Sequence, residues 1–301
     1  MGAAHSSKSQ SAMEYLMTYG WAILIIAIVL IAIFQLGILG GTNVAPHATA
    51  GACQIYRSTA GSSLAGQCNN LEPQFVSHFT ETPYYPYILV PDSGALDPTS
   101  QITVTAWVYP NSQLANNPGG SVDHDILSKG VDVATGGSSG SYSLLGGAGT
   151  TIDASFFVYI NGALKSASSG VLQANRWYFY TGTYNGVSVC IFVNGVSAQC
   201  NGDTGAITTV ANPLGIGSDS PPVRFYNGSI SNVQIYNTSL SQSEITALYQ
   251  EGIGGAPIDP THIVGWWPLN GNVQDYSGNN NNGVPSNIVY TSSWTSSYTQ
   301  P

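Results

Sequence analysis

Apolar residues follow two different patterns along the 301 residues of this chain. The first is one uninterrupted apolar run at residues 21–39, which contains a single amide, Gln35, and no charge. As a helix at about 1.5 Å per residue, this run would span about 28 Å, close to the ~30 Å hydrocarbon core of a bilayer. It therefore predicts one membrane-spanning helix, with everything from about Thr42 onward on one side of the membrane.

The second pattern begins at Phe75, where short alternating apolar runs are separated by turn residues. Runs rich in β-branched and aromatic residues predict strands at 102–109, 142–145, 176–184, 187–193 and 196–200. Two Asn-Gly pairs, at 185–186 and 194–195, predict β-hairpin turns. Residues 242–250 alone have a helical pattern, so the chain is expected to be mainly β, a jelly-roll β-sandwich preceded by one long hydrophobic helix.

Composition narrows the range of functions. Only 7% of the residues are charged, and fifteen acids against six bases give a formal net charge of −9. The bases form no stripe that could neutralise phosphates, which excludes nucleic acid as a partner: they are Lys8, Arg57, Lys129, Lys165, Arg176 and Arg224. A chain rich in Gly, Ser, Thr, Asn and Tyr is typical of all-β surface proteins.

The cysteines indicate an oxidising exterior. All four follow the apolar run, and an even number suits a disulfide-bonded domain outside the cell. Lys8, the base nearest the amino end of the run, favours a cytoplasmic N-terminus. Two glycosylation sequons, at Asn227 and Asn237, lie on the same exterior side.

The pairing of the cysteines follows from the hairpin at 194–195. A two-residue loop would place Cys190 opposite Gln199, whereas a three-residue loop with a G1 bulge would place it opposite Cys200. We therefore predict disulfides Cys190–Cys200 and Cys53–Cys68, the pairing that closes the shortest loops. The second bond would close a loop within a Gly-, Ala- and Ser-rich stalk at 42–74.

Residues 8–16, Lys-Ser-Gln-Ser-Ala-Met-Glu-Tyr-Leu, precede the apolar run, and together with it they resemble the class III signal peptide of archaeal type IV pilins. The resemblance implies cleavage between Ser9 and Gln10, with Glu14 as the fifth mature residue. A carboxylate at the head of an apolar helix is costly in lipid unless paired. Glu14 lies one turn from the amine that cleavage would free at Gln10, and it could pair with that amine or with a neighbouring subunit's. The alternative is a plain anchor with a solvated Glu14.

Six motifs beyond residue 75 resemble, in order, the LamG-like, concanavalin A-like jelly roll: 88–91, 102–110, 126–130, 191–195, 214–218 and 226–237. The resemblance covers about residues 75–250 and implies a surface domain that binds a glycan or a protein. The stretch that usually opens the family, here Trp267 to Gly283, comes last. A circular permutation would pair residues 263–269 with 230–236; a truncated second copy is the alternative.

Relatives of this kind often hold one calcium ion, and Asp275 in its Gly- and Asn-rich loop is the candidate ligand. The acid expected on the neighbouring strand is replaced by Ser231, and an Asx-type turn explains Asp275 equally well. Asp123-His124-Asp125 could also bind a metal, but the pattern favours a solvated loop tip.

Glycosidases on this fold need two carboxylates flanking the scissile bond, and the glutamates of this chain are isolated, so we expect no enzyme activity. Four tryptophans fall on predicted strands and are expected in the core: Trp107, Trp177, Trp266 and Trp267. Trp294, Tyr84 and Tyr85 are the candidates for exposed stacking on a sugar.

Four segments are expected: a leader at 1–9, a transmembrane or assembly helix at 10–41, the stalk at 42–74 and the jelly-roll domain at 75–301. The expected function is that of an archaeal pilin-like protein that displays an adhesive or carbohydrate-binding domain outside the cell. Its partners would be the membrane, other pilin-like subunits in a surface filament and an extracellular ligand. A membrane-anchored binder that never assembles is the alternative, and an extracellular glycosidase is the third.

Overall fold

The computed structural model describes residues 19–20, 23–27, 29, 47–48, 72–80, 84–111, 123–130 and 140–301. Contacts divide the chain into two units, Met1–Ala45 and Pro46–Pro301. The described residues of the first unit are helical, and no helix in the described ranges is both long and apolar enough to cross a membrane. The predicted cleavage site at Ser9 and Gln10, together with Glu14 and the Cys53–Cys68 bond, lies outside the described residues.

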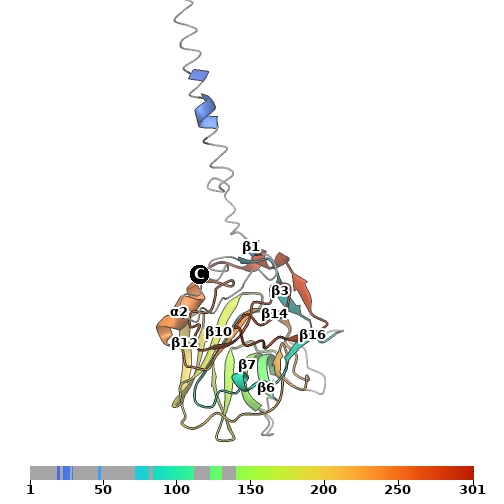
Figure 1. The fold of residues 1–301 in the computed structure, drawn as a ribbon, viewed down its shortest axis with the longest axis vertical. Coiled ribbons are helices and arrows are strands. Elements are labelled where there is room, and N and C mark those ends of the chain that lie inside the picture. Colours follow the sequence, from blue (N-terminus) through green and yellow to red (C-terminus); the bar gives the residue numbers. More distant parts are fainter. Residues whose placement is uncertain are drawn as a thin grey trace, which may run out of the picture. The chain divides into compact units, whose positions relative to one another are not determined.

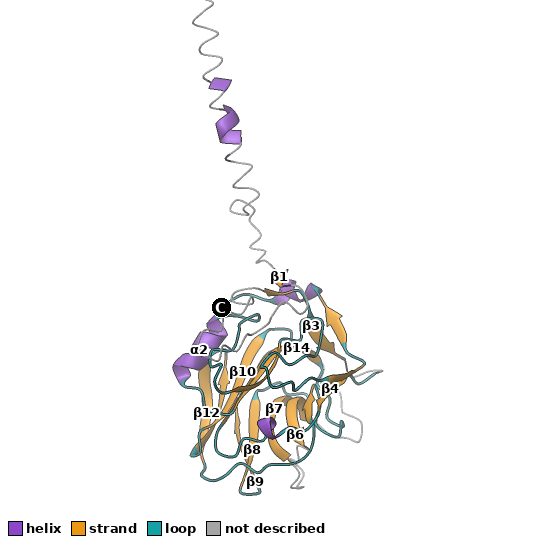
Figure 2. Ribbon diagram, in the orientation of Figure 1, coloured by secondary structure: helices purple, strands orange, loops and turns teal. Residues whose placement is uncertain are grey.

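The second unit is a sandwich of two antiparallel sheets (Figures 1 and 2). The first sheet has the order β12-β11-β10-β5-β14-β3-β17, and β15 also pairs with β14. Its strands are β3 (Val76–Phe79), β5 (Ile102–Pro110), β10 (Tyr178–Tyr184), β11 (Ser188–Val193), β12 (Val196–Gly202), β14 (Gly228–Tyr236), β15 (Ile263–Trp267) and β17 (Val289–Thr291). The mainly β prediction is confirmed.

The second sheet has the order β16-β4-β13-β6-β7-β8-β9. Its strands are β4 (Tyr87–Val90), β6 (Asp123–Gly130), β7 (Gly140–Ala148), β8 (Ser155–Ile160), β9 (Ala163–Ser168), β13 (Leu214–Ile216) and β16 (Val284–Ser286). A separate two-residue parallel pair joins β1 (His47–Ala48) to β2 (Glu72–Pro73), within the predicted stalk. The compact unit thus begins at Pro46, ahead of the expected domain start at 75.

The central strands of the first sheet are buried on both faces, whereas the edge strand β12 is exposed. Along β5, Val104 and Val108 point into the core between the sheets, while Trp107 and Tyr109 lie on the outer face. That outer face is covered by helix α2 (Gln242–Gln250) and by the C-terminal 3₁₀ turn η2 (Ser293–Ser297). The four tryptophans expected in the core are buried. Three of them, Trp107, Trp177 and Trp266, belong to the cluster under this cover, and Trp267 lies in the core between the sheets.

Helix α2 covers the residues predicted for it. Ser241 caps it: the Ser241 side chain accepts from the Glu244 backbone N–H, and the Glu244 carboxylate accepts from the Ser241 backbone N–H. Ile245 and Leu248 are buried against the outer face of the first sheet. Apolar residues three positions apart lie on one side of a helix, which is why this short segment binds the sheet by a single stripe.

The hairpin of β11 and β12 confirms one predicted disulfide, but its loop is shorter than predicted. Cys190 lies opposite Cys200, with 4.1 Å between their Cα atoms, and the two are bonded. The loop, however, is the two-residue Asn194-Gly195 turn, since Val193 pairs with Val196. A bulge beyond Phe192 supplies the extra residue that brings the cysteines into register, so the predicted three-residue loop is wrong.

The late Trp-containing stretch completes the first sheet. Strand β15 pairs antiparallel with β14, and Val233 lies opposite Trp267 and Tyr236 opposite Ile263. Trp267 is fully buried, and its indole N–H donates to the carbonyl oxygen of Asn281 over 2.9 Å. The pairing predicted from the permuted order of the motifs is confirmed, and the segment is part of the same sandwich.

The tight contact between the sheets gives a test of this packing. A Cβ at Gly182 of β10 would lie 2.2 Å from Cδ2 of the buried Phe156, whereas one at Gly202 of β12 would meet nothing within 4 Å. We expect Gly182→Ala to lower the free energy of unfolding by about 1–3 kcal/mol, because the added methyl overpacks the core. Gly202→Ala is the control and should be neutral or slightly stabilising. Equal urea midpoints for the two variants would contradict this packing.

Candidate pocket on the outer face of the first sheet

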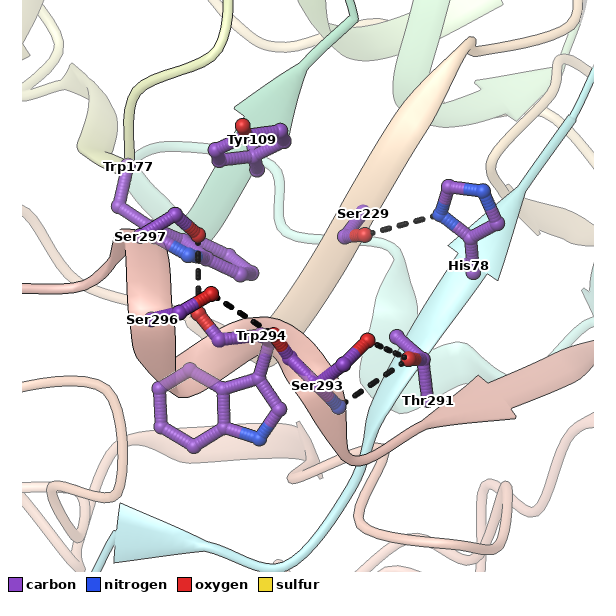
Figure 3. A pocket seen from close by; sticks show the side chains of 9 residues that line it. All are labelled: His78, Tyr109, Trp177, Ser229, Thr291, Ser293, Trp294, Ser296 and Ser297. Atoms are coloured by element: carbon purple, nitrogen blue, oxygen red, sulfur yellow. Dashed lines mark hydrogen bonds between the residues drawn. The ribbon is translucent and has the colours of Figure 1, made fainter.

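A pocket of about 290 Å³ lies where the cover of the first sheet ends. It opens between the outer face of the sheet and the C-terminal segment formed by β17 and η2 (Figure 3). Its walls are His78, Tyr109, Trp177, Ser229, Thr291, Ser293, Trp294, Ser296 and Ser297.

Three neighbouring strands supply the floor of the pocket. Ser229 of β14 lies directly opposite His78 of β3 on one side and Tyr109 of β5 on the other. Side chains of directly paired residues point to the same face of a sheet, so the three form one row. Nδ1 of His78 and the hydroxyl of Ser229 are 3.0 Å apart and hydrogen-bonded. The row is therefore fixed by strand register as well as by a side-chain bond.

Aromatic rings form one wall. Trp177, just before β10, lies 5.6 Å from the ring of Tyr109 and 6.0 Å from that of Trp294, the latter edge to face. Tyr298 packs against Trp177 and Trp294 from behind. The indole N–H groups of Trp177 and Trp294 are buried and have no hydrogen-bond partner within the described ranges. This wall presents flat apolar surface with two donors inside it.

Hydroxyl groups of the β17 and η2 segment line the pocket beside the aromatic rings (Figure 3). The hydroxyls of Thr291 and Ser293 are 2.9 Å apart, and those of Ser296 and Ser297 donate to the carbonyl oxygens of Ser293 and Trp294. A hydroxyl that donates to the backbone keeps its lone pairs as acceptors. These four side chains can therefore accept hydrogen bonds from a ligand without breaking the turn that holds them.

The pocket carries no fixed charge. None of the nine described residues that line it has a carboxylate, an amine or a guanidinium group. Burial lowers the pKa of His78, so its imidazole is neutral at neutral pH. The Ser229–His78 pair could begin a nucleophilic site, but the lining offers no carboxylate to orient the imidazole. Aromatic faces beside hydroxyls and a neutral imidazole suit an uncharged polyhydroxylated ligand.

Comparison with known proteins identifies the fold. The family model of the concanavalin A-like lectin/glucanases superfamily matches residues 82–246, more than half of the chain. The chain belongs to this superfamily. The match confirms the LamG-like resemblance seen in the motifs, over nearly the same residues. No curated protein matches the chain.

Several solved structures resemble this chain at low sequence identity. A Bacteroides ovatus protein to which carbohydrate binding is provisionally assigned is 17% identical, with a TM-score of 0.53 over 73% of this chain. This chain covers 60% of that protein's length. A heptameric pentraxin from Limulus polyphemus is 14% identical (TM-score 0.46, 72% of this chain, 93% of the other). Domain 4 of a Geobacillus stearothermophilus arabinanase is 16% identical (0.37, 54% and 71%). At these identities the likeness concerns the fold alone.

The residues proposed for exposed stacking do not form one site. Trp294 is only 4% exposed, so the prediction that it is exposed is wrong; it instead forms part of the aromatic wall. Tyr84 is 66% exposed and Tyr85 packs on Phe225 at 5.0 Å, and neither lines the pocket. The burial of Trp294 depends on Trp177, a residue far away in sequence.

Asp275 anchors the loop that follows β15. Its Oδ1 accepts the backbone N–H groups of Trp266 and Ser277, and its Oδ2 accepts the Ser277 hydroxyl and the Asn281 N–H, all within 3.0 Å. These four bonds account for the conformation of the loop. Among the described residues no three His, Cys, Asp or Glu side chains are grouped to hold a metal. Calcium at Asp275 stays a prediction.

Asp123, His124 and Asp125 lie in β6 and are buried, so the solvated loop tip predicted for them is wrong. Nδ1 of His124 lies 3.1 Å from the carbonyl oxygen of Phe225, and Asp123 is 3.6 Å from Nε of Arg224. The strand extends through these polar residues because a distant segment supplies partners for them. Local sequence gave no sign of that segment.

The two sequons differ in access. The side-chain oxygen of Asn227 accepts from Asn111 over 2.7 Å, and the hydroxyl of its sequon, Ser229, is buried in the floor of the pocket. Asn237, at the end of β14, is exposed. Of the two predicted glycosylation sites, Asn237 offers the accessible amide.

The buried imidazoles predict how stability depends on pH. Burial lowers the pKa of His78 and of His124 below the ordinary 6.5, so below that pH the unfolded chain binds protons that the folded chain does not. The free energy of unfolding should therefore fall as the pH drops from about 7.5 to about 6, by at most about 1.4 kcal/mol per histidine and pH unit. Urea unfolding of His78→Gln should show a smaller loss than the parent. An identical loss would contradict the burial of this imidazole.

Proposed function

We propose that this protein is a cell-surface carbohydrate-binding protein and that the pocket on the outer face of the first sheet holds a neutral sugar ring. The observation that carries the proposal is the lining, which combines aromatic rings with hydroxyls and has no charged side chain. The provisional assignment of carbohydrate binding to the Bacteroides ovatus protein supports the same ligand class.

The size and chemistry of the pocket fit a single sugar unit. Its volume of about 290 Å³ is at the lower end of the range, about 300–1,000 Å³, of small-ligand sites. A pyranose has an apolar face of C–H groups that can pack on Tyr109 and Trp177, while its hydroxyls bond to Ser229 and Thr291. Such a ring needs donors and acceptors from both sides, and the hydroxyls and imidazole supply both.

We propose binding without catalysis. Glycoside hydrolysis requires two carboxylates about 5–10 Å apart across the scissile bond. The walls of this pocket hold none, and the glutamates of the chain are isolated in sequence. The Ser229–His78 bond serves in this proposal to fix two polar groups that face the sugar.

The cell-surface location in this proposal rests on the N-terminal segment. The apolar run at 21–39 and the pilin-like sequence around Gln10 and Glu14 support a single-pass membrane protein with an exterior domain. In this proposal a prepilin peptidase removes residues 1–9, and Glu14 then pairs with a free amine during filament assembly. A calcium ion at Asp275 would be structural, because Asp275 does not line the pocket.

Sugar binding is tested by a matched pair of tyrosine variants. A glycan array on the parent domain identifies a ligand, and titration calorimetry then measures its affinity for Tyr109→Ala and Tyr84→Ala. Loss of the Tyr109 ring should weaken binding about tenfold, the equivalent of about 1.4 kcal/mol of stacking. Tyr84 is exposed and outside the pocket, so its loss should leave the affinity unchanged. The reverse order would place the sugar at the Tyr84 cluster and refute the pocket.

Processing is tested on the full chain in an archaeal host that matures type IV pilins. Mass spectrometry should find a mature N-terminus at Gln10, and Glu14→Gln should be cleaved normally but excluded from filaments. An intact Met1 would contradict pilin-type maturation. Cleavage without filaments in the parent would favour the membrane-anchored binder that does not assemble.

A further inference from the structure

Lys129 is a cation in the interior of the domain. It lies in β6, and its side chain is 0% exposed. Its Nζ contacts the carboxylate of Asp92, donates to the carbonyl oxygen of Asn212 over 2.7 Å and lies 3.4 Å from Oδ1 of Asp97. The amine thus lies near two carboxyl groups and a carbonyl oxygen.

Buried side chains lie next to this cluster. Leu96, between the two acids in sequence, is fully buried, and Tyr142 is fully buried with its hydroxyl bonded to the Leu96 carbonyl. Burial, more than any neighbouring charge, raises the pKa of Asp97 above its ordinary value. Where charge is penalised, passing a proton from an ammonium to a carboxylate costs much less than it does in water.

We propose that Lys129 and Asp92 form an intramolecular amide (isopeptide) bond, with Asp97 as the group that carries the proton. This inference does not depend on the sugar-binding proposal.

The bond forms by condensation. Nζ passes one proton to the Asp92 carboxylate, which becomes a carboxylic acid, and the lone pair left behind points at the Asp92 Cγ. The Nζ–Cγ bond then forms. Asp97 takes a second proton from Nζ and delivers it to the Asp92 hydroxyl, the C–O bond breaks and water leaves. One ammonium and one carboxylate become one amide and one water, so no oxidant or cofactor is needed. The Asp92 side chain is 35% exposed, which gives the water a way out.

The position of the bond would reinforce the second sheet. Leu214 of β13 pairs with Lys129 of β6 on one side and with Val90 of β4 on the other. Asp92 follows Val90 by two residues, so the bond would cross β13 and tie three strands together. An exterior protein that meets proteases or pulling forces would gain from a covalent link that no reducing agent can open.

Mass spectrometry of the reduced parent protein tests the proposal. The intact mass should be lower than the sequence mass by one water. An amide at Lys129 also blocks trypsin, so fragment 58–129 should be missing and fragment 58–165 should be found one water lighter. Cleavage after Lys165 is the internal control, because that lysine forms an ordinary surface ion pair with Asp203. A full sequence mass together with fragment 58–129 would overturn the proposal.

Two variants assign the roles. Lys129→Arg keeps the charge but offers no amine, and it should show the full sequence mass. Asp97→Asn keeps the size of the side chain but cannot carry the proton, so fragment 58–129 should return. Loss of water in Asp97→Asn would refute the part given to Asp97. The parent's mass decides whether the bond exists, even if a variant fails to fold.

Discussion

The structure depends on burying both faces of the first sheet. The inner face of β5 and β10 is mainly apolar, and their outer face carries Trp107 and Phe179 among threonines. These two rings need cover as much as Val104 and Tyr180 do on the inner face. The second sheet covers the inner face. Helix α2 and the C-terminal turn η2 cover the outer face, and neither belongs to a sheet. Both segments are therefore part of the core of the fold.

The pocket follows from the same constraint. The cover extends across the aromatic part of the outer face and stops at the row of His78, Ser229 and Tyr109, where the side chains become polar. The turn η2 contacts Trp177 at one end and continues from the edge strand β17 at the other. The space between these two points is not filled, and it forms the pocket. Its walls combine apolar and polar surface because they lie at the boundary between the covered and uncovered parts of one sheet.

Sequence patterns predicted those parts of the fold that depend on interactions between residues close together in the chain. The Asn-Gly turns, the Ser241-to-Glu244 capping box and the alternation along β5 each act within a few residues, so the strands, α2 and the Cys190–Cys200 hairpin could be read from sequence. The pairing of β15 with β14 could be read because the motifs keep their order after permutation. The pocket could not, since its residues come from strands paired through long-range register. The sequence did contain one signal for the pocket. Aromatic residues on the otherwise polar side of the strands indicate that this second face of the sheet is also covered.

Long-range partners also explain the two errors about exposure. Trp294 is flanked by serines and threonines, and such a setting predicts an exposed ring unless another ring covers it; Trp177 does so from more than one hundred residues away. From sequence alone Asp123 is expected in solvent, but in the structure Arg224 lies beside it. Among the described residues, the buried Lys129 and Arg224 each lie against carboxylates, and no charged side chain lines the pocket. In the proposed function the pocket holds a sugar ring through stacking and hydrogen bonds, which need no fixed charge.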